Sequence, residues 1–195
     1  MNETITNASA GDLEVIYQLF EEAILFQKKN HYVGWNSYDR EFIQSDIRDG
    51  LLFKMVKEEG DIICIFSICY SDALIWREKE KGDAVYLHRL VLNRKFAGEK
   101  CFKKVLEWAI AFAEARELNY IRMDTWAENE KIIAYYKSYG FSFVENYTTP
   151  DTANLPLQHR QLNVALLELD VKAVGGPNHL TKEHSHKTVK TMKQL

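Results

Sequence analysis

A basic loop in the middle of the chain has the residue types of an anion-binding site. Residues 93–100 read NRKFAGEK and carry three cations together with Gly98. A nearly continuous apolar run, 84–92, precedes the loop, and an amphipathic helix predicted over 99–117 follows it. The free N–H groups and the positive dipole end of such a helix favour an anion, for example a pyrophosphate. Solvated loop cations are the alternative interpretation of the same residues.

Three side chains have the chemistry of proton transfer. His88 lies within the apolar run, and its ordinary pKa of about 6.5 suits the uptake of a proton. A hydrogen-bonded core histidine would give the same pattern, and Asp124 or a water chain are alternatives for the base. Tyr136 is a candidate general acid, because a phenol can hydrogen-bond a leaving group and protonate it. Packing of this ring against a sheet is its alternative role.

Two motifs lie in and after a strand predicted over 120–126. They read Asp124-Thr-Trp-Ala-Glu-Asn129 and Tyr136-Lys-Ser-Tyr-Gly-Phe141. They match the pattern of the GNAT acetyltransferase superfamily, in which a strand is followed by an Asn and by a Tyr shortly before Gly-Phe. The chain resembles this superfamily over about residues 4–170. Its acetyl-CoA loop motif, Arg/Gln-x-x-Gly-x-Gly/Ala, is degenerate here, with the Arg/Gln and the two glycines replaced by Ala97, Lys100 and Phe102.

The resemblance implies an N-acetyltransferase with acetyl-CoA as co-substrate. Such an enzyme moves the acetyl group to a primary amine of a small molecule or protein by direct attack in a ternary complex. Tyr136 would be the general acid, with His88 as the candidate base. Trp35, Tyr32 and Trp126 are the candidate acceptor-binding residues, since aromatic rings can receive a cation, or they plug the edge of the core. A catalytically weak or inactive acyl-CoA-binding regulatory module is the alternative function, which the degenerate loop favours.

The resemblance also assigns cofactor contacts. Backbone groups at the end of the strand 84–92 would pair with the pantetheine arm as an added strand does. Backbone N–H groups at the start of the following helix would hold the pyrophosphate. Asn129 can reach the cofactor arm or cap its own helix. The predicted cofactor-binding residues are Leu90, Val91, Leu92, Ala97, Gly98, Glu99, Lys100, Cys101, Phe102 and Asn129.

Hydrophobic periodicity predicts the element order β-α-α-β-β-β-α-β-α-β-β, which by itself indicates an α/β or α+β fold. The resemblance implies a single domain over residues 1–171, with a twisted, mixed, mostly antiparallel sheet flanked by helices. Residues 71–83, which include Trp76, are predicted to form a polar connection. Residues 172–195 have few large apolar groups and are predicted to be a flexible tail.

The composition limits the classes of partner and compartment. The chain has 195 residues, a net charge of −3 and 46% hydrophobic residues, which favours one globular domain without a nucleic-acid or membrane partner. Its three cysteines are odd in number and favour a reducing cytoplasm. No metal is expected, because His184 and His186 lack other ligand types nearby. A monomer or a homodimer is expected.

Overall fold

The computed structural model describes residues 3–174, and its strands form one sheet in the order β1-β2-β3-β4-β5-β7-β6. Only the β4–β5 pair is parallel among these neighbours. The mixed, mostly antiparallel sheet predicted from the resemblance is therefore confirmed. The strands are β1 Glu3–Asn7, β2 Leu52–Lys57, β3 Ile62–Cys69, β4 Ala84–Leu92, β5 Tyr120–Trp126, β6 Ser142–Thr148 and β7 Asn163–Asp170.

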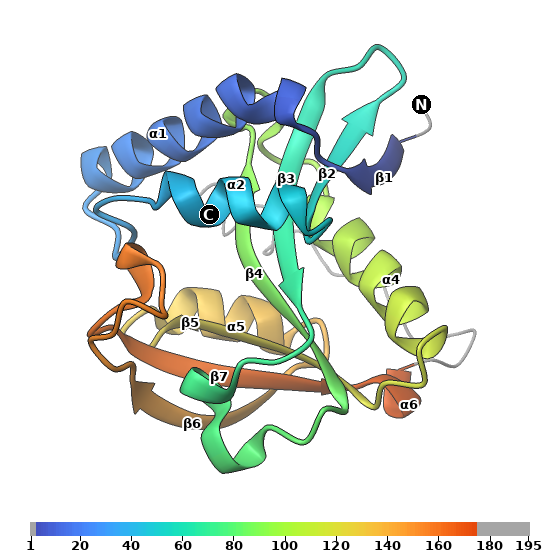
Figure 1. Ribbon diagram of the computed structural model, residues 1–195, viewed down its shortest axis with the longest axis vertical. Coiled ribbons are helices and arrows are strands. Elements are labelled where there is room, and N and C mark those ends of the chain that lie inside the picture. Colours follow the sequence, from blue (N-terminus) through green and yellow to red (C-terminus); the bar gives the residue numbers. More distant parts are fainter. Residues whose placement is uncertain (1–2, 175–195) are drawn as a thin grey trace.

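Helices cover both faces of the sheet (Figure 1). The helices α1 (Leu13–Lys29) and α2 (Arg40–Arg48) pack on one face, and α4 (Cys101–Glu114) and α5 (Glu130–Lys137) pack on the other. Successive strand residues point to opposite faces, so Val91 packs under α1 and α2 while Leu92 packs under α4. The buried stripe of α4 is the one its 3- and 4-residue spacing predicts: Phe102, Val105, Leu106, Ala109, Ile110 and Ala113.

The predicted polar connection over residues 71–83 is wrong in one respect. It contains the short helix α3 (Ala73–Trp76) and a further turn of 3-10 helix (Arg77–Lys79). The Trp76 side chain is fully buried, with its ring centroid 5.8 Å from that of Tyr86. This segment folds inward because it covers the part of the sheet face that α1 and α2 leave open, where a third apolar cluster forms.

Helical structure is present at the predicted domain end, residue 171, and in the three residues after it. Val171–Val174 forms the short helix α6, and both end residues pack against the core beneath α4. The predicted tail beyond this helix, with His184 and His186, lies outside the described residues. Within residues 3–174, no helix combines the length and apolar character needed to cross a bilayer.

The strands β4 and β5 separate halfway along their length. They pair through Ala84–Leu87 and Tyr120–Met123, and beyond these residues they diverge (Figure 1). A β-bulge adds to the separation, because β4 uses three steps from His88 to Val91 where β3 uses two. Within this bulge Arg89 adopts a positive φ of 51°. His88 and Asp124 are therefore the first residues beyond the last paired ones.

Candidate active site

A small cavity of about 70 Å³ lies where β4 and β5 separate. Its walls come from both faces of the sheet, because α4 and α5 supply Phe102 and Tyr136 while the opposite side supplies Trp35 and His159. The gap between the strands thus connects the two faces. His88, Arg89, Leu90, Asp124 and Trp126 line it from the strands themselves.

Two carboxylates flank the imidazole of His88. Its Nε2 lies 3.4 Å from Oδ2 of Asp72, and its Nδ1 lies 3.5 Å from Oδ1 of Asp124. All three side chains are about nine-tenths buried. The nearest carboxylate oxygens receive no hydrogen bond from the residues that the structure describes. Buried oxygens without donors are uncommon in native proteins, and two of them lie in this one cluster.

The electrostatics of the cluster assign different roles to its members. Burial alone lowers the pKa of His88, but Cys69 and the Asp72 carboxylate raise it well above its ordinary range. Burial raises the pKa of Asp124 to about 6, even though His88 acts in the opposite direction. At neutral pH the imidazole is therefore charged and Asp124 is the free base. This favours Asp124, which the sequence left as an alternative, over His88 as the proton acceptor.

Arg89 and His159 belong to the same cavity, and the sequence did not indicate them. The Arg89 guanidinium pairs with Asp46 of α2 and donates from Nε to Ser67 Oγ at 3.3 Å. Burial lowers the pKa of His159 well below its ordinary range, and the neighbouring His88 and Arg89 lower it further. The ring of His159, 5.9 Å from that of His88, is thus neutral. An arginine in an otherwise apolar strand was the available signal for Arg89.

Tyr136 faces the cavity from α5. It is 4% exposed and meets Phe102 edge to face, with ring centroids 4.9 Å apart. Burial, and then the nearby Asp124 carboxylate, raise the pKa of Tyr136 above its ordinary range, so its hydroxyl keeps its proton. The neighbouring Tyr135 is equally buried but does not line the cavity. This geometry suits the acid role predicted for Tyr136, which stays a prediction.

Two of the three predicted acceptor-binding aromatics meet in the cavity. The rings of Trp35 and Trp126 lie 5.8 Å apart, and the backbone N–H of Trp35 donates to Gln27 Oε1 at 3.1 Å. Tyr32 instead packs near Phe26 and lines a separate shallow pocket. The order of aromatics in the loop 31–37 did not determine which ring faces inward.

The basic loop reaches α4 through a tight turn. Gly98 has a φ of +100°, and Lys100 occupies the N-cap position, so α4 begins two residues later than predicted. The side chains of Cys101 and Phe102 are buried, and Glu99 accepts an ion pair from Lys57 at 2.8 Å. Because these three side chains are buried or paired, an anion at this helix start would be bound by the first backbone N–H groups of α4.

Other predicted cofactor-binding residues have structural contacts of their own. Asn129 caps α5, with its Oδ1 accepting from the backbone N–H of Ile132 at 3.1 Å. Its side-chain N–H groups can still donate to a ligand. Leu90 lines the cavity, whereas Val91 and Leu92 are buried in the cores on opposite faces. Their backbone contribution to cofactor binding, like that of Ala97, stays a prediction.

Comparison with known proteins identifies the family. The model of the acetyltransferase (GNAT) family matches residues 14–141. The chain belongs to this family. The recognition made from the motifs after β5 is thereby confirmed, and the matched range includes the whole of the separated strand pair and the helices α4 and α5.

Relatives of this GNAT chain agree with that assignment. An N-acetyltransferase of Bacillus subtilis (strain 168), YesJ, described as uncharacterised, is 32% identical over 105 residues. That match covers 52% of the present chain and 58% of the relative, so the chain spans little more than half of the relative's length.

Two solved structures show the same fold. A GNAT acetyltransferase of Listeria monocytogenes 4b F2365 superposes with a TM-score of 0.70 at 20% identity, over 86% of this chain and 94% of that one. YncA of Salmonella typhimurium, a putative acetyltransferase solved with acetyl-CoA, gives a TM-score of 0.60 at 18% identity, over 88% of this chain and 95% of that one.

Proposed function

We propose that the protein is an acetyl-CoA-dependent N-acetyltransferase that acts on a primary amine. The observation that carries the proposal is a buried base and a buried phenol at one opening in the sheet. Asp124 reaches the cavity from β5 and Tyr136 reaches it from α5 on the opposite face. Acyl transfer to an amine needs one group that accepts a proton and one that donates a proton.

The reaction assigns a role to each group. Asp124 accepts a proton from the acceptor ammonium, and the freed nitrogen lone pair attacks the thioester carbonyl carbon. A C–N bond forms and the C–S bond breaks, and the hydroxyl proton of Tyr136 goes to the leaving thiolate. The new amide nitrogen then loses its second proton to solvent. The Tyr136 phenolate takes a proton back from solvent, and Asp124 releases its proton to solvent. His88 remains charged beside Asp124 and orients that carboxylate. Asp72 in turn holds His88 from its other ring nitrogen, as a positioning residue.

Backbone groups are the natural means of holding acetyl-CoA here. The edge of β4 that faces β5 has no partner strand after Leu87, so an extended ligand arm can add to it. The start of α4 and its basic loop lie near the end of the same strand and suit the pyrophosphate. Acetyl-CoA supplies the activated acetyl group when it is bound.

Two measurements test the proposal. Calorimetric titration with acetyl-CoA, with NADH as a control ligand, is expected to give a Kd of about 1 µM, equal to about −8 kcal/mol. Release of free thiol is then followed with a set of amines that differ in charge. Binding without transfer to any amine would instead favour the inactive acyl-CoA-binding module. Absence of binding would contradict both functions.

Lys100→Gly tests the degenerate loop separately. The exposed Lys100 replaces a glycine of the family pattern at the start of α4. If its ammonium contacts phosphate, the variant should bind acetyl-CoA about fivefold more weakly, with a shallower dependence on salt. Tighter binding of the variant would show that this side chain obstructs the site.

A further inference from the structure

The charges around the cavity leave an excess of one negative charge. Asp72 and Asp124 flank the charged His88, and Asp46 pairs with Arg89. Three carboxylates thus face two cations, while His159 is neutral because burial lowers its pKa. The excess lies in a small and largely buried space, where the low dielectric strengthens its attraction for a cation.

The excess charge has an identifiable position. The contact from Asp124 Oδ1 to His88 is 3.5 Å long and does not meet hydrogen-bond geometry, and the described residues give this oxygen no other donor. Asp124 also lines the cavity, whereas Asp72 lies behind His88 and does not. An ammonium ion supplies the donors and the charge that Asp124 Oδ1 lacks.

The walls beside this oxygen suit an apolar amine. Trp126 follows Asp124 by two residues on β5, so both side chains lie on the same face of the strand. Trp35 packs against Trp126 from the loop before α2. Indole faces attract cations and also bury aliphatic carbon. A short carbon chain next to an ammonium would satisfy both contacts.

Both cations that line the cavity are already paired with carboxylates, so neither is available to bind an anionic substrate. These cations are His88 and Arg89. A substrate carboxylate or phosphate would therefore lie next to Asp124 without a counter-charge. Like charges placed together at such a site strongly disfavour binding.

The same three residues have the composition of a divalent-metal site, but their arrangement differs from one. Ligand atoms of Asp72, His88 and Asp124 lie within 4.8 Å of one another. The two carboxylates, however, approach different nitrogens of the same imidazole ring. A metal bound to either nitrogen would have one of the aspartates on the far side of the ring. Each ring nitrogen instead lies closest to a different carboxylate, 3.4 Å from Asp72 and 3.5 Å from Asp124.

We propose that the acceptor is a small aliphatic monoamine without carboxylate or phosphate, bound as its ammonium ion by Asp124 against Trp35 and Trp126. This inference rests on the proposed N-acetyltransferase function and specifies the substrate class of the same site. It predicts that the enzyme distinguishes amine substrates by the charge at the far end of their carbon chain, away from the reacting amine.

Three amines of equal chain length test this class. Butylamine is the simple monoamine, γ-aminobutyrate adds a carboxylate, and putrescine adds a second ammonium. With acetyl-CoA present, kcat/KM for butylamine is expected to exceed that for γ-aminobutyrate by about 100-fold. Equal rates, or a preference for γ-aminobutyrate, would overturn the inference while leaving the acetyltransferase function intact. A tenfold or greater preference for putrescine would overturn the inference that the acceptor carries a single ammonium group.

Direct binding separates the inference from the chemistry. Calorimetry of butylamine with the protein–CoA complex needs no turnover. Asp124→Asn and Trp126→Leu are expected to weaken butylamine binding about tenfold or more, whereas Trp126→Phe retains part of the affinity. Asp49→Asn, at the exposed end of α2, is the matched charge control and should bind as the parent does.

Two further results would overturn the inference. The first is unchanged butylamine affinity in Asp124→Asn together with normal affinity for acetyl-CoA. The second is a calorimetric titration with zinc chloride that shows micromolar binding, lost in both Asp72→Asn and Asp124→Asn, because it would assign the cluster to a metal. Failure of acetyl-CoA itself to bind would instead contradict the proposed function on which the inference rests.

Discussion

Two polar pairs lie next to each other on one face of the sheet and differ in how well they are satisfied. Tyr86 of β4 lies opposite Arg122 of β5 within the paired region, and two residues further along come His88 and Asp124. Arg122 donates to Glu168 at 2.7 Å, to the Lys79 carbonyl at 2.9 Å and to the Tyr86 hydroxyl at 3.0 Å. The two ring nitrogens of His88 lie 3.4 Å and 3.5 Å from the nearest oxygens of Asp72 and Asp124, and these two oxygens have no hydrogen-bond donor among the described residues.

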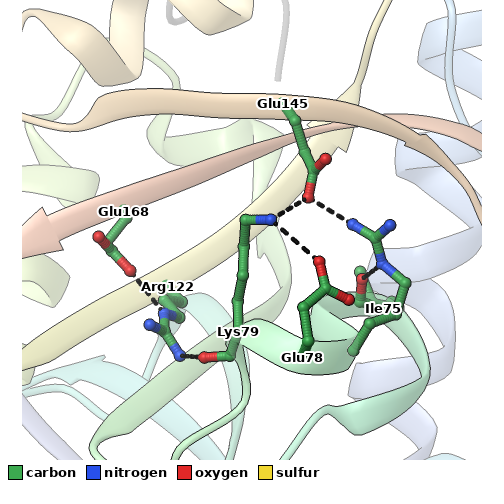
Figure 2. Close-up of polar contacts among 7 residues, drawn as sticks. Ile75, Glu78, Lys79, Arg122, Glu145 and Glu168 are labelled. Atoms are coloured by element: carbon green, nitrogen blue, oxygen red, sulfur yellow. Dashed lines mark hydrogen bonds and ion pairs between the residues drawn. The ribbon is translucent and has the colours of Figure 1, made fainter.

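The satisfied pair belongs to a wider network. Figure 2 shows Arg122 joined to Glu168 and to the backbone of Lys79, whose ammonium reaches Glu145 at 2.9 Å. Glu145 also pairs with Arg77. Together these contacts fix the segment after β3 against β5, β6 and β7, and the same segment contains Asp72, immediately before α3. The structural network therefore supports the position of a member of the active site.

The comparison shows what strand separation does to polar side chains. Where β4 and β5 are paired, the side chains on this face are close enough to complete each other's hydrogen bonds. Where the strands diverge, the same kind of side chain keeps hydrogen-bonding atoms without a protein partner, and these atoms can bind a ligand. We expect mutations at the first pair to change stability and mutations at the second to change activity.

Asp124→Asn is the change with the largest expected effect on activity. Loss of the proposed base should lower kcat/KM by about 1,000-fold, within the range for general base catalysis. The free energy of unfolding in urea should change by less than about 1 kcal/mol, because the variant also removes a buried charge. A loss of stability as large as that of a core mutation would place Asp124 with the structural pair.

Arg122→Met should have the opposite profile. Removing one member of a buried ion pair leaves Glu168 without its partner, so the free energy of unfolding should fall by about 3 kcal/mol. Acetyl transfer, measured at a temperature where the variant is folded, should stay within about threefold of the parent. A large loss of activity with unchanged stability would show that the two pairs cannot be distinguished by function.

Tyr136→Phe should lower kcat by about 100-fold, because the thiolate would leave without a proton donor. Acetyl-CoA affinity, measured by calorimetry, should be unchanged. Tyr135→Phe is the matched control, since this equally buried tyrosine of α5 does not line the cavity. Equal effects of the two substitutions would assign Tyr136 to packing rather than to acid catalysis.

The pH profile of kcat/KM should follow Asp124. The base must be ionised to accept a proton, and the raised pKa of Asp124, about 6, places its protonation below neutral pH. Activity should therefore fall about tenfold per pH unit below pH 6 and level off above it. Asp124→Asn should remove this limb from the residual activity. A profile that is flat down to pH 5 would exclude Asp124 as the base.

Gly34→Ala should have the smallest effect and should be confined to the acceptor side. A Cβ at this position would lie 2.2 Å from Gln27 Oε1, the atom that accepts from Trp35 N–H. We expect the KM for the amine to rise about fivefold, with acetyl-CoA affinity unchanged, as Trp35 loses its support. Gly11→Ala is the control, because Gly11 has no positive φ and a Cβ there would meet only Ser9 Oγ, at 3.7 Å.

The sequence predicted those parts of the fold that depend on local pattern. The bounds of β4 and β5 agree with the predicted strands 84–92 and 120–126, since apolar runs are local signals. The structure brings Tyr136, His88 and Asp124 to one cavity. His88 and Asp124 were candidates because they lie in predicted strands, and Tyr136 was a candidate because of the motif that it begins. The turn chemistry at Gly98 shifted the start of α4, which the periodicity of the helix alone could not locate.

The residues that the sequence missed are brought in by contacts between distant segments. Asp72 lies in a connection that looked polar, and His159 lies in a turn-rich loop, so neither had a local pattern that indicated a site. Arg89 reaches the cavity through a bulge, which depends on the register with β3. Tyr32 lies in a different pocket from Trp35 and Trp126, and a loop gives no periodicity from which the direction of a side chain can be predicted.

The short junction between β4 and β5 has a consequence for the dynamics of the molecule. The sheet consists of one group of strands, β1 to β4, and a second group, β5, β7 and β6, and the two groups are joined by only four paired residues of β4 and β5. Each group can therefore open as a separate cooperative unit, and amide hydrogen exchange should fall into two classes along this line. A ligand arm that bonds to β4 in the gap would merge the two classes into one.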